Sequence, residues 1–490
     1  MAPSGLTPTY LFYDLETTGL NPAFDQILQF AALRSDAGLK EIERVNLRIA
    51  LRPDVIPSPD ALLTHAIGIQ QAISGDCCEF DGLGEIHRRV NTPGTVSLGY
   101  NSLGFDDDFL RFGFYRNLLT PYTHQYARGC RRMDLLPIAI LYWLYGPSDL
   151  LHWPNEAGKP TLKLEHLSRA NALAAGPAHD ALVDVSATAA LARRFQQARE
   201  MWDYVLGYFD KAEDARRCQA LPRAIPDAGG DYRLGIAVES QLGFQRMFQA
   251  PVLALGDSSA YRNQTLWLRL DSETLGDAAA GNFDQSTWVI RKKYGEPAII
   301  LPPLARYWEK LTQPAQAQAK ANLDLLARQL DLLAAITQYH RQYRYPEIPD
   351  VDLDAALFEV GFLQSHEEAL CREFRQADLQ GRAEMVARFE RKELRQLAGR
   401  IFGRNFPDQM PGHLAAAYEA YLRRVADGEG EGGLKDYRGE FRTTPGAALA
   451  RIDQLKTKGE AADPAELKLL DDLADYIRRR FAVRTKDTGG

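Results

Sequence analysis

The sequence reads Tyr10-Leu-Phe-Tyr-Asp14-Leu-Glu16-Thr-Thr-Gly19 close to its start, an apolar run that closes with two carboxylates and a glycine. Side chains of a strand alternate between its two faces, so Asp14 and Glu16 point to the same side, about 7 Å apart. Like charges at that separation repel each other unless a cation lies between them. The stretch therefore predicts a strand that ends at a divalent-metal site, and further oxygen ligands are expected elsewhere in the chain.

The composition is that of an ordinary soluble globular protein with several domains. The chain has 490 residues, of which 45% are hydrophobic and 25% charged, and at roughly 150 residues per domain it is long enough for about three domains. No run of about 18 apolar residues indicates a membrane span. The N-terminus also lacks the basic and apolar regions of a secretory signal. We expect no association with a membrane.

The cysteine spacing and the net charge of the chain bear on its cellular compartment and on whether it binds nucleic acid. The five cysteines form no Cys-x-x-Cys pair and no zinc-like spacing with histidine, which favours a reducing compartment and a cytoplasmic location. The formal net charge of −7 does not by itself indicate a nucleic-acid-binding protein. A binding groove depends on local charge, however, so the net value does not exclude one.

Three regions with different patterns follow one another. Residues 10–200 alternate strand-like and helix-like segments, which predicts a mixed α/β sheet flanked by helices. Strands are expected at 10–16, 26–34, 43–51 and 95–100, and helices near 58–73, 105–118, 132–145, 161–172 and 181–200. In the second region, short strands at 264–270 and 287–292 precede a helical stretch at 314–343. After a linker at 343–350, residues 352–480 show helical spacing almost throughout, with a flexible loop expected at 426–433 and fraying at 484–490.

A further acidic residue follows another predicted strand. Leu98-Gly-Tyr-Asn101 leads into a loop, and Asp106 falls in the first turn of the next helix. A carboxylate at that position complements the helix dipole and can cap the helix, and it can also serve as a metal ligand. Taken alone, Asp106 leaves both alternatives open.

The third segment of interest is Gly176-Pro-Ala-His179-Asp180-Ala-Leu-Val-Asp184. Asp180 is a good N-cap for a helix that begins at Ala181. Two residues five apart on one helix diverge by about 140°, so His179 can act together with Asp184 only if it lies on the loop before the cap. By itself this pair is weak evidence for a site, and a surface histidine with satisfied hydrogen bonds is the better interpretation.

Together the three segments supply four carboxylates and one titratable base. Oxygen ligands favour Mg²⁺ or Mn²⁺ over zinc, and two such ions about 4 Å apart can activate a water and stabilise the leaving oxygen of a phosphodiester. A histidine with an ordinary pKa near 6.5 can accept the proton of that water near neutral pH. The combination predicts metal-dependent hydrolysis of a phosphodiester.

These motifs resemble those of the DEDDh 3′–5′ exonuclease superfamily, in the order Asp14-x-Glu16, Asn101-x4-Asp106 and His179-x4-Asp184. The resemblance implies a ribonuclease H-like domain that hydrolyses nucleic acid from the 3′ end and releases nucleoside 5′-monophosphates. It also implies two Mg²⁺ ions, for which Mn²⁺ can substitute, and it assigns catalytic roles as follows: metal ligands Asp14, Glu16, Asp106 and Asp184, and general base His179.

The resemblance is strongest to the bacterial members specific for single-stranded DNA. It is carried by Phe105-Asp-Asp107, Phe114-Tyr-Arg-Asn117, Asp134-Leu-Leu136, Trp153-Pro-Asn155 and Leu164-Glu-His-Leu167, and more thinly by Phe358–Phe362 and Arg404-Asn-Phe-Pro407. It implies an exonuclease domain at 1–201, an SH3-like domain with a helical extension at 202–348 and a helical domain at 349–490. The expected protein is a monomeric, processive exodeoxyribonuclease of DNA repair and recombination. A further expected partner is the acidic C-terminal tail of single-strand-binding protein, for which Arg291, Lys292 and Lys293 are candidate contacts.

A groove for single strands needs cations for phosphates and aromatic faces for bases. By resemblance, the substrate-binding residues are Leu15, Glu16, Thr17, Arg111, Tyr122, Tyr126 and Lys163. Lys163 stands where the family carries an arginine, so a point charge replaces a bidentate fork. At helical spacing, Phe112, Phe114 and Tyr115 are expected in the core.

Two alternative functions remain at this stage. One is a DEDDh exonuclease that acts on RNA or as a proofreading module, since the sequence does not show a site that reads the 2′-hydroxyl. The other is a non-catalytic scaffold that binds single strands, although all five residues of the catalytic set are present.

Overall fold

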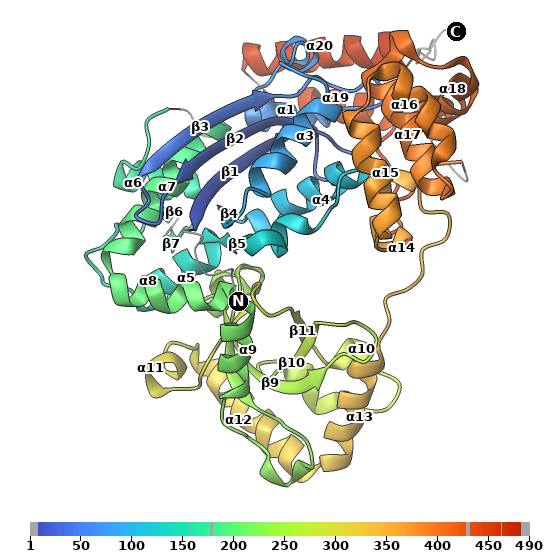
Figure 1. Ribbon diagram of the computed structural model, residues 1–490. Coiled ribbons are helices and arrows are strands. Elements are labelled where there is room, and N and C mark those ends of the chain that lie inside the picture. The colour runs from blue at the N-terminus through green and yellow to red at the C-terminus, as the bar shows by residue number, and fades with distance from the viewer. Residues whose placement is uncertain (1–7, 157, 177–179, 428–431, 462, 482–490) are drawn as a thin grey trace. The chain divides into compact units, whose positions relative to one another are not determined.

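The computed structural model describes residues 8–156, 158–176, 180–427, 432–461 and 463–481 (Figure 1). The chain divides into two compact units. Unit 1 comprises Met1–Arg131, Ala175–Ser186 and Glu347–Gly490, and unit 2 comprises Arg132–Ala174 and Ala187–Pro346. The C-terminal segment thus belongs to the same unit as the first 131 residues.

The first sheet is mixed, and all of it except most of its last strand belongs to unit 1. Its strands are β1 (Thr9–Thr17), β2 (Ile27–Ser35), β3 (Glu41–Arg48), β4 (Thr95–Gly99) and β5 (Arg131–Asp134), in the order β3-β2-β1-β4-β5. β1 pairs antiparallel with β2 and parallel with β4, and β2 pairs antiparallel with β3. The four predicted strands are therefore confirmed, although the third begins at Glu41 and ends at Arg48. β5 was not predicted: the helix expected from residue 132 begins only at Leu135.

Helices of unit 1 come from both ends of the chain. From the N-terminal part they are α1 (Pro59–His65), α2 (Ile69–Ile73), α3 (Glu79–Val90) and α4 (Asp106–Arg116). The C-terminal part adds α14 (Leu357–Val360), α15 (Ser365–Gln376), α16 (Leu379–Met385), α17 (Lys392–Asn405), α18 (Gly412–Asp427), α19 (Pro445–Thr457) and α20 (Pro464–Arg480). The single helix predicted at 58–73 is two helices, because Ala66 adopts a left-handed conformation with φ 55°.

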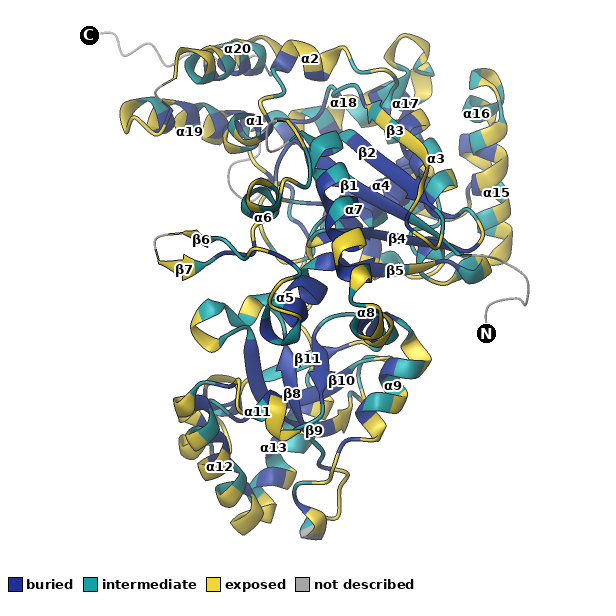
Figure 2. Cartoon of the chain, turned by 90° about the vertical axis from the view of Figure 1, so that its left-hand side faces the viewer, coloured by how far each residue is buried: buried dark blue, intermediate teal, exposed yellow. Residues whose placement is uncertain are grey.

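Two apolar cores hold unit 1 together. One lies between the sheet and helices α3 and α4, and includes Tyr13, Phe30, Leu83 and Phe109. The larger core joins the segments before and within α4 to the C-terminal helices, with Phe112 and Ile477 among its members. In Figure 2 the strands β1 and β2 are dark blue while α15 exposes one side. The C-terminal helices therefore pack against the same helices, α3 and α4, that cover the sheet.

Unit 2 is built on a second, wholly antiparallel sheet. Its order is β11-β10-β9-β8-β12, from β8 (Leu234–Val238), β9 (Gln249–Asp257), β10 (Thr265–Arg269), β11 (Val289–Lys292) and β12 (Ile299–Leu301). The sheet agrees with the expected SH3-like fold, and the strands predicted at 264–270 and 287–292 are β10 and β11. A two-stranded sheet is formed by β6 (Asn155–Glu156) and β7 (Lys159–Pro160).

The helices of unit 2 cover this sheet and extend from it. They are α5 (Leu135–Tyr145), α6 (Leu164–Asn171), α8 (Arg199–Leu206), α9 (Lys211–Gln219), α10 (Phe283–Ser286), α11 (Ala305–Trp308), α12 (Gln313–Arg328) and α13 (Leu330–Gln342). Helix α7 (Ala181–Gln197) contributes its first turns to unit 1 and the rest to unit 2. The long helix predicted at 314–343 is broken at Gln329, whose backbone is not helical.

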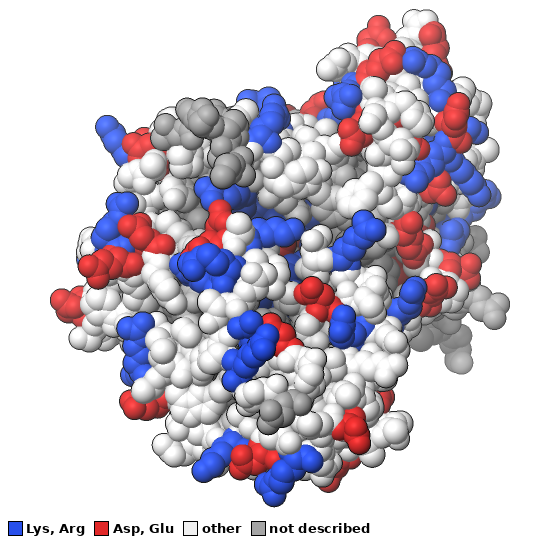
Figure 3. Space-filling model, turned by 60° about the horizontal axis from the view of Figure 1, so that its bottom comes forward, with Lys and Arg blue, Asp and Glu red and all other residues white. Residues whose placement is uncertain are grey.

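The charged side chains on the surface and the hydropathy of the helices agree with what the composition predicts. On the face shown in Figure 3, Lys and Arg side chains are interspersed with Asp and Glu, so the negative net charge is not gathered there into one field. No helix in the described ranges is both long enough and apolar enough to cross a membrane.

Candidate active site

The two carboxylates of the opening motif lie on the central strand of the unit 1 sheet. Asp14 stands opposite Ala31 of β2 and Glu16 opposite Gln29, and the regular register ends directly after Glu16. Glu16 is 8% exposed, while Asp14 is partly exposed. As predicted, Asp14 and Glu16 are two residues apart on β1, so both carboxylates lie on one face of the sheet.

Asp106 is tied to the same strand. It is the first residue of α4, is 5% exposed, and its Oδ1 accepts a hydrogen bond of 3.1 Å from the backbone N–H of Leu15. That N–H belongs to the residue between Asp14 and Glu16. The bond therefore fixes the third carboxylate beside the first two.

The third motif is placed by the start of α7. The Asp180 Oδ1 accepts a 2.9 Å hydrogen bond from the backbone N–H of Leu182, which confirms that Asp180 caps the helix. Asp184 lies in the first turn of α7 and is partly exposed. His179, the predicted general base, lies outside the described residues.

The pKa values show that these carboxylates are close enough to influence one another. Burial raises the pKa of Asp14 well above its ordinary value, and the charges of Asp106 and Asp184 raise it further. Burial raises the pKa of Glu16 to about 9, with added repulsion from Asp14, Asp184 and Asp180. A divalent cation among the carboxylates would reverse both effects, since it favours the ionised forms.

The donor set fits a hard divalent cation. All four side chains offer carboxylate oxygens, and their mutual repulsion is what such a cation relieves. Within the described part of the chain, no group of three or more Asp, Glu, His and Cys side chains is arranged closely enough to hold a metal ion as it stands. The pKa shifts nevertheless place the carboxylates in one neighbourhood.

The predicted DNA contacts differ in how accessible they are. Tyr126 is 68% exposed, and Tyr122 is partly buried with its ring centroid 6.0 Å from the Arg111 guanidinium carbon. Arg111 is paired with Asp107 at 3.1 Å and contacts Asp108, so much of its charge is already neutralised.

The other predicted contacts are placed as follows. Leu15 and Thr17 are 5% and 6% exposed, and the Thr17 hydroxyl donates to the Gly19 carbonyl at 2.7 Å, so both offer little surface to a base. The Lys163 side chain, in unit 2, is 62% exposed and lies 3.7 Å from Glu156. As predicted, Phe112, Phe114 and Tyr115 are core residues.

Sequence reasoning missed the arginine that holds the loop after the first motif. Arg116 is fully buried on α4 and donates hydrogen bonds to the carbonyls of Pro22 and Ala23, both at 2.7 Å, and of Asp25 at 3.0 Å. It thereby fixes the chain directly after the Asp14–Glu16 strand. The only signal in the sequence was a cation within the apolar face of a predicted helix.

A second missed feature is a network of buried charges between the two ends of unit 1. Arg404 of α17 donates to Asp54 at 3.0 Å and to Asp354 at 3.1 Å, and Tyr421 donates to Asp54 at 2.8 Å. Arg442 donates to the Tyr421 hydroxyl at 2.8 Å. The network links the segment before α1 to the C-terminal helices.

Comparisons with known proteins agree with this geometry. Residues 11–192 match the family described as Exonuclease. The chain is similar to Exodeoxyribonuclease I of Escherichia coli (strain K12), with 36% identity over 208 residues, which are 41% of this chain and 43% of the relative. The sequence match thus spans less than half of that relative's length.

Solved structures extend the likeness in fold to both units. The crystal structure of E. coli Exonuclease I in complex with a dA16 oligonucleotide has a TM-score of 0.81 at 23% identity, and the match covers 96% of this chain and 100% of that chain. A structure of SSB/Exonuclease I in complex with the inhibitor CFAM has a TM-score of 0.80 at 22% identity, covering 97% and 100%. The fold is therefore shared over nearly the whole chain.

Proposed function

We propose that this protein is a 3′→5′ exodeoxyribonuclease that degrades single-stranded DNA and releases nucleoside 5′-monophosphates. The observation that carries the proposal is the gathering of Asp14, Glu16, Asp106 and Asp184 in one neighbourhood of the part of the chain that matches the exonuclease family. Burial and the charges of Asp106 and Asp184 raise the pKa of Asp14, and burial and the charges of Asp14, Asp184 and Asp180 raise that of Glu16. The similarity to a protein named Exodeoxyribonuclease I and the likeness in fold to a structure that contains a DNA oligonucleotide support the choice of substrate.

The carboxylates would hold two divalent ions, with Mg²⁺ as the expected metal and Mn²⁺ as a substitute. When bound, the ions would lower the pKa of a water and neutralise the leaving oxygen of the phosphodiester. The chain's own part is to keep the ligands in place: the Leu15 N–H orients Asp106, and Arg116 holds the loop that follows β1. The capped start of α7 sets the direction from which Asp184 approaches.

His179 directly precedes the helix cap Asp180 in the sequence. We propose that His179 acts together with Asp184 and is the general base of the reaction. In this role its neutral imidazole accepts the proton of the attacking water. This assignment rests on the resemblance of His179-x4-Asp184 to the third motif of the superfamily.

The wider role follows from the same likeness. We propose a processive, monomeric enzyme of DNA repair and recombination, located in the cytoplasm, that also binds the acidic tail of single-strand-binding protein. The SSB/Exonuclease I structure with a shared fold supports the last point. Of the predicted contacts for that tail, Lys292 is fully buried and lies 2.6 Å from Asp214, so Arg291 and Lys293 are the remaining candidates.

The test is release of mononucleotides from 3′-labelled and 5′-labelled single-stranded DNA, with matched RNA in parallel, in Mg²⁺ and in EDTA. We expect release from the 3′ end of DNA that stops in EDTA and in the Asp14→Ala variant. Preferential digestion of RNA would instead support the ribonuclease alternative. Activity that persists in EDTA would overturn the metal-dependent mechanism.

A further inference from the structure

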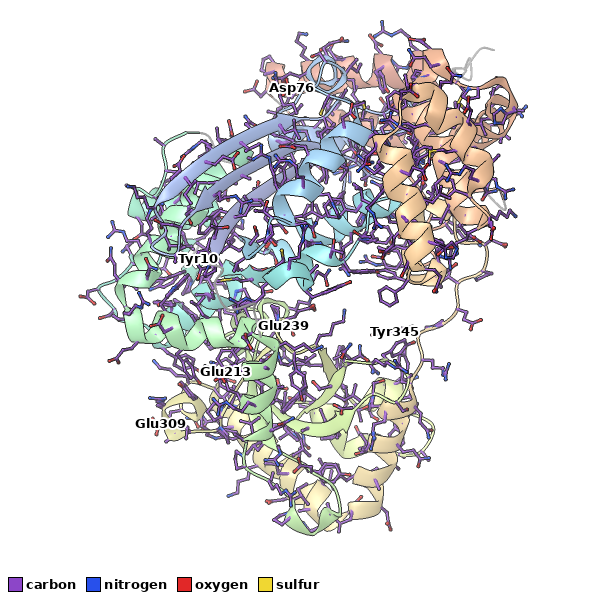
Figure 4. All side chains as sticks on the ribbon, in the orientation of Figure 1. Tyr10, Asp76, Glu213, Glu239, Glu309 and Tyr345 are labelled. Atoms are coloured by element: carbon purple, nitrogen blue, oxygen red, sulfur yellow. The ribbon has the colours of Figure 1, made fainter. Side chains whose placement is uncertain are left out.

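The loop after the central strand of unit 1 lies next to a proposed metal ligand. Residues 18–26, which we call the β1–β2 loop, begin two residues after Glu16. Figure 4 labels Tyr10 near the start of β1, and the loop follows the opposite end of that strand. The Asp25 carboxylate closes the loop, because it accepts a 2.9 Å hydrogen bond from the backbone N–H of Asn21. The loop is therefore one compact piece joined to the end of β1.

A hairpin from the C-terminal part of unit 1 is bonded to this loop. Residues 434–442 pair with each other in antiparallel fashion, and we call them the C-terminal hairpin. The Asn21 Nδ2 donates a 2.9 Å hydrogen bond to the Asp436 Oδ2, a residue 415 positions further along the chain. In a second contact, the Arg442 guanidinium carbon lies 5.4 Å from the centroid of the Phe24 ring. The hairpin therefore contacts the β1–β2 loop at two places.

The same hairpin contacts the helix that carries another proposed ligand. The ring of Tyr437 stacks on that of Phe112 of α4, with 5.2 Å between the centroids and 21° between the ring planes. Phe112 is fully buried, and α4 begins with Asp106. Because Asp436 and Tyr437 are neighbours in the sequence, one hairpin contacts both elements that supply these proposed ligands.

The C-terminal hairpin is itself firmly held within unit 1. Its Arg442 donates to the Tyr421 hydroxyl at 2.8 Å, and the Arg442 backbone N–H donates to the Leu434 carbonyl at 2.8 Å. From outside the hairpin, the Asp352 backbone N–H donates to the Lys435 carbonyl at 2.9 Å. Leu434 is 2% exposed and belongs to the larger core of unit 1. A hairpin fixed in this way can hold the β1–β2 loop and α4 at a set spacing.

A second turn in the chain shows that the contact with Asn21 is not needed to form the hairpin. In the turns at Asp436 and Asp36, one carboxylate oxygen accepts hydrogen bonds of 2.8–2.9 Å from the backbone N–H groups two and four residues later. Asp36 is partly exposed, and its side chain makes no hydrogen bond to another element within the described ranges. Asp436 is 1% exposed. Its burial and its bond to Asn21 are therefore additional to what the turn requires.

We propose that Asp436 and Tyr437 are positioning residues of the active site, because the C-terminal hairpin sets the spacing between the end of β1 and the start of α4. That spacing decides how the carboxylates on these two elements meet a metal ion. Residues that orient metal ligands without touching the metal affect its affinity. This inference rests on the proposed function, since it takes Glu16 and Asp106 as metal ligands. It assigns part of the site to residues outside 11–192, the range that matches the exonuclease family.

The experiment exchanges the two partners of the hydrogen bond between Asn21 and Asp436 in the full-length protein. Asp436→Asn keeps the oxygen that closes the turn, but it turns an amide N–H group towards the Asn21 amide, so that two donors face each other. Asn21→Asp instead places two carboxylates face to face. The double variant Asn21→Asp/Asp436→Asn restores one donor and one acceptor and has the same total charge as the wild type.

Three quantities are measured: Mn²⁺ affinity by calorimetry, the melting temperature in EDTA, and the Mg²⁺ concentration that gives half-maximal nucleotide release. We expect each single variant to bind Mn²⁺ about 10-fold more weakly, the lower end of the range for residues that orient metal ligands. The Mg²⁺ requirement should rise by a similar factor. The double variant should recover most of the loss, and the control Asp36→Asn, which changes the same kind of turn, should bind Mn²⁺ like the wild type.

The outcomes separate a positioning role from a role in stability alone. A lower melting temperature with unchanged Mn²⁺ affinity, or a loss of affinity that the exchange does not recover, would overturn the proposal. If a single variant does not fold, Tyr437→Leu gives the same measurement at the contact with α4, and wild-type affinity there would also overturn it. If the wild type binds Mn²⁺ but releases no nucleotides, the proposed function fails, while the exchange still decides the positioning role.

Discussion

Replacement of Arg404 by methionine tests whether the two ends of unit 1 form one cooperative structure. The Arg404 side chain is 1% exposed and lies between the fully buried carboxylates of Asp54 and Asp354. Removing one partner of a buried ion pair costs about 3–5 kcal/mol, because the remaining charge is left without compensation. Arg52 remains 3.2 Å from Asp54 and Arg400 remains 3.0 Å from Asp354, so we expect the lower end, about 3 kcal/mol.

The measurement is urea denaturation in EDTA, followed by far-UV circular dichroism. The matched control is Arg388→Met, which removes an exposed pair with Glu373 at 2.8 Å in the same helical region. An exposed pair contributes about 0–1 kcal/mol, so this control should differ little from wild type. The Arg404→Met/Asp354→Asn double variant should recover part of the loss, since the second change removes one uncompensated charge.

Two results would refute this reasoning. One is a loss below about 1 kcal/mol for Arg404→Met, which would mean that the network contributes no more than a surface pair. The other is a separate, earlier transition of the C-terminal helices, with the N-terminal part of unit 1 left intact. That result would favour an independent C-terminal domain at 349–490, as the sequence pattern predicts.

Three further predictions concern the site and the surfaces. Asp106→Ala should lower the rate of nucleotide release by about 100-fold or more, the loss expected when a metal ligand is removed, and wild-type rates in the same assay would exclude Asp106 as a ligand. Glu16 has a pKa of about 9 and must lose its proton before it can bind a metal ion. Metal affinity, measured by calorimetry, should therefore rise by up to about tenfold per pH unit between pH 6 and 9. An affinity that does not depend on pH would contradict the raised pKa. Lys292→Glu should unfold unit 2, because the fully buried lysine lies 2.6 Å from the carboxylate of Asp214. Lys293→Glu, at an exposed position, should leave the melting temperature within about 2 °C of wild type. Equal melting temperatures for the two variants would show that burial does not distinguish the two lysines.

Low pH should destabilise unit 1 through the network of buried charges around Arg404. The pKa of Asp354 is held well below its usual range by Arg400 and Arg404, which outweigh burial. A carboxylate with a depressed pKa contributes stability above its ordinary value near 4, and that stability is lost as the pH falls below it. Part of the acid sensitivity of unit 1 therefore comes from this network.

The sequence predicted the parts of the site that depend on local rules. Strand alternation places Asp14 and Glu16 on one face, and the helix signals place Asp106 in the first turn of α4 and Asp180 at the cap of α7. Neither rule refers to the rest of the chain. The expectation of core positions for Phe112 and Phe114 succeeded for the same reason, since helical spacing alone decides it.

The features that the sequence did not predict all depend on partners far away in the chain. Arg404 and Asp54 are 350 residues apart, and no pattern of spacing relates them. Arg111 was expected to be free for phosphates, but it contacts Asp107 and Asp108 of its own helix. Lys292 reads as one of three surface cations, yet strand pairing turns it inwards to Asp214. Periodicity shows which face a residue is on, but not which element covers that face.

The separation along the chain between Asp54 and Arg404 has a consequence during synthesis. All four carboxylates of the motifs have been translated by residue 184, but the larger core of unit 1 includes Leu470 and Ile477. At about 5–20 residues per second, the 350 residues between Asp54 and Arg404 take roughly 20–70 s to emerge from the ribosome. From residue 184 onwards the nascent chain therefore has all four carboxylates before its C-terminal helices exist, and we expect the proposed hydrolysis of DNA to begin only when translation ends.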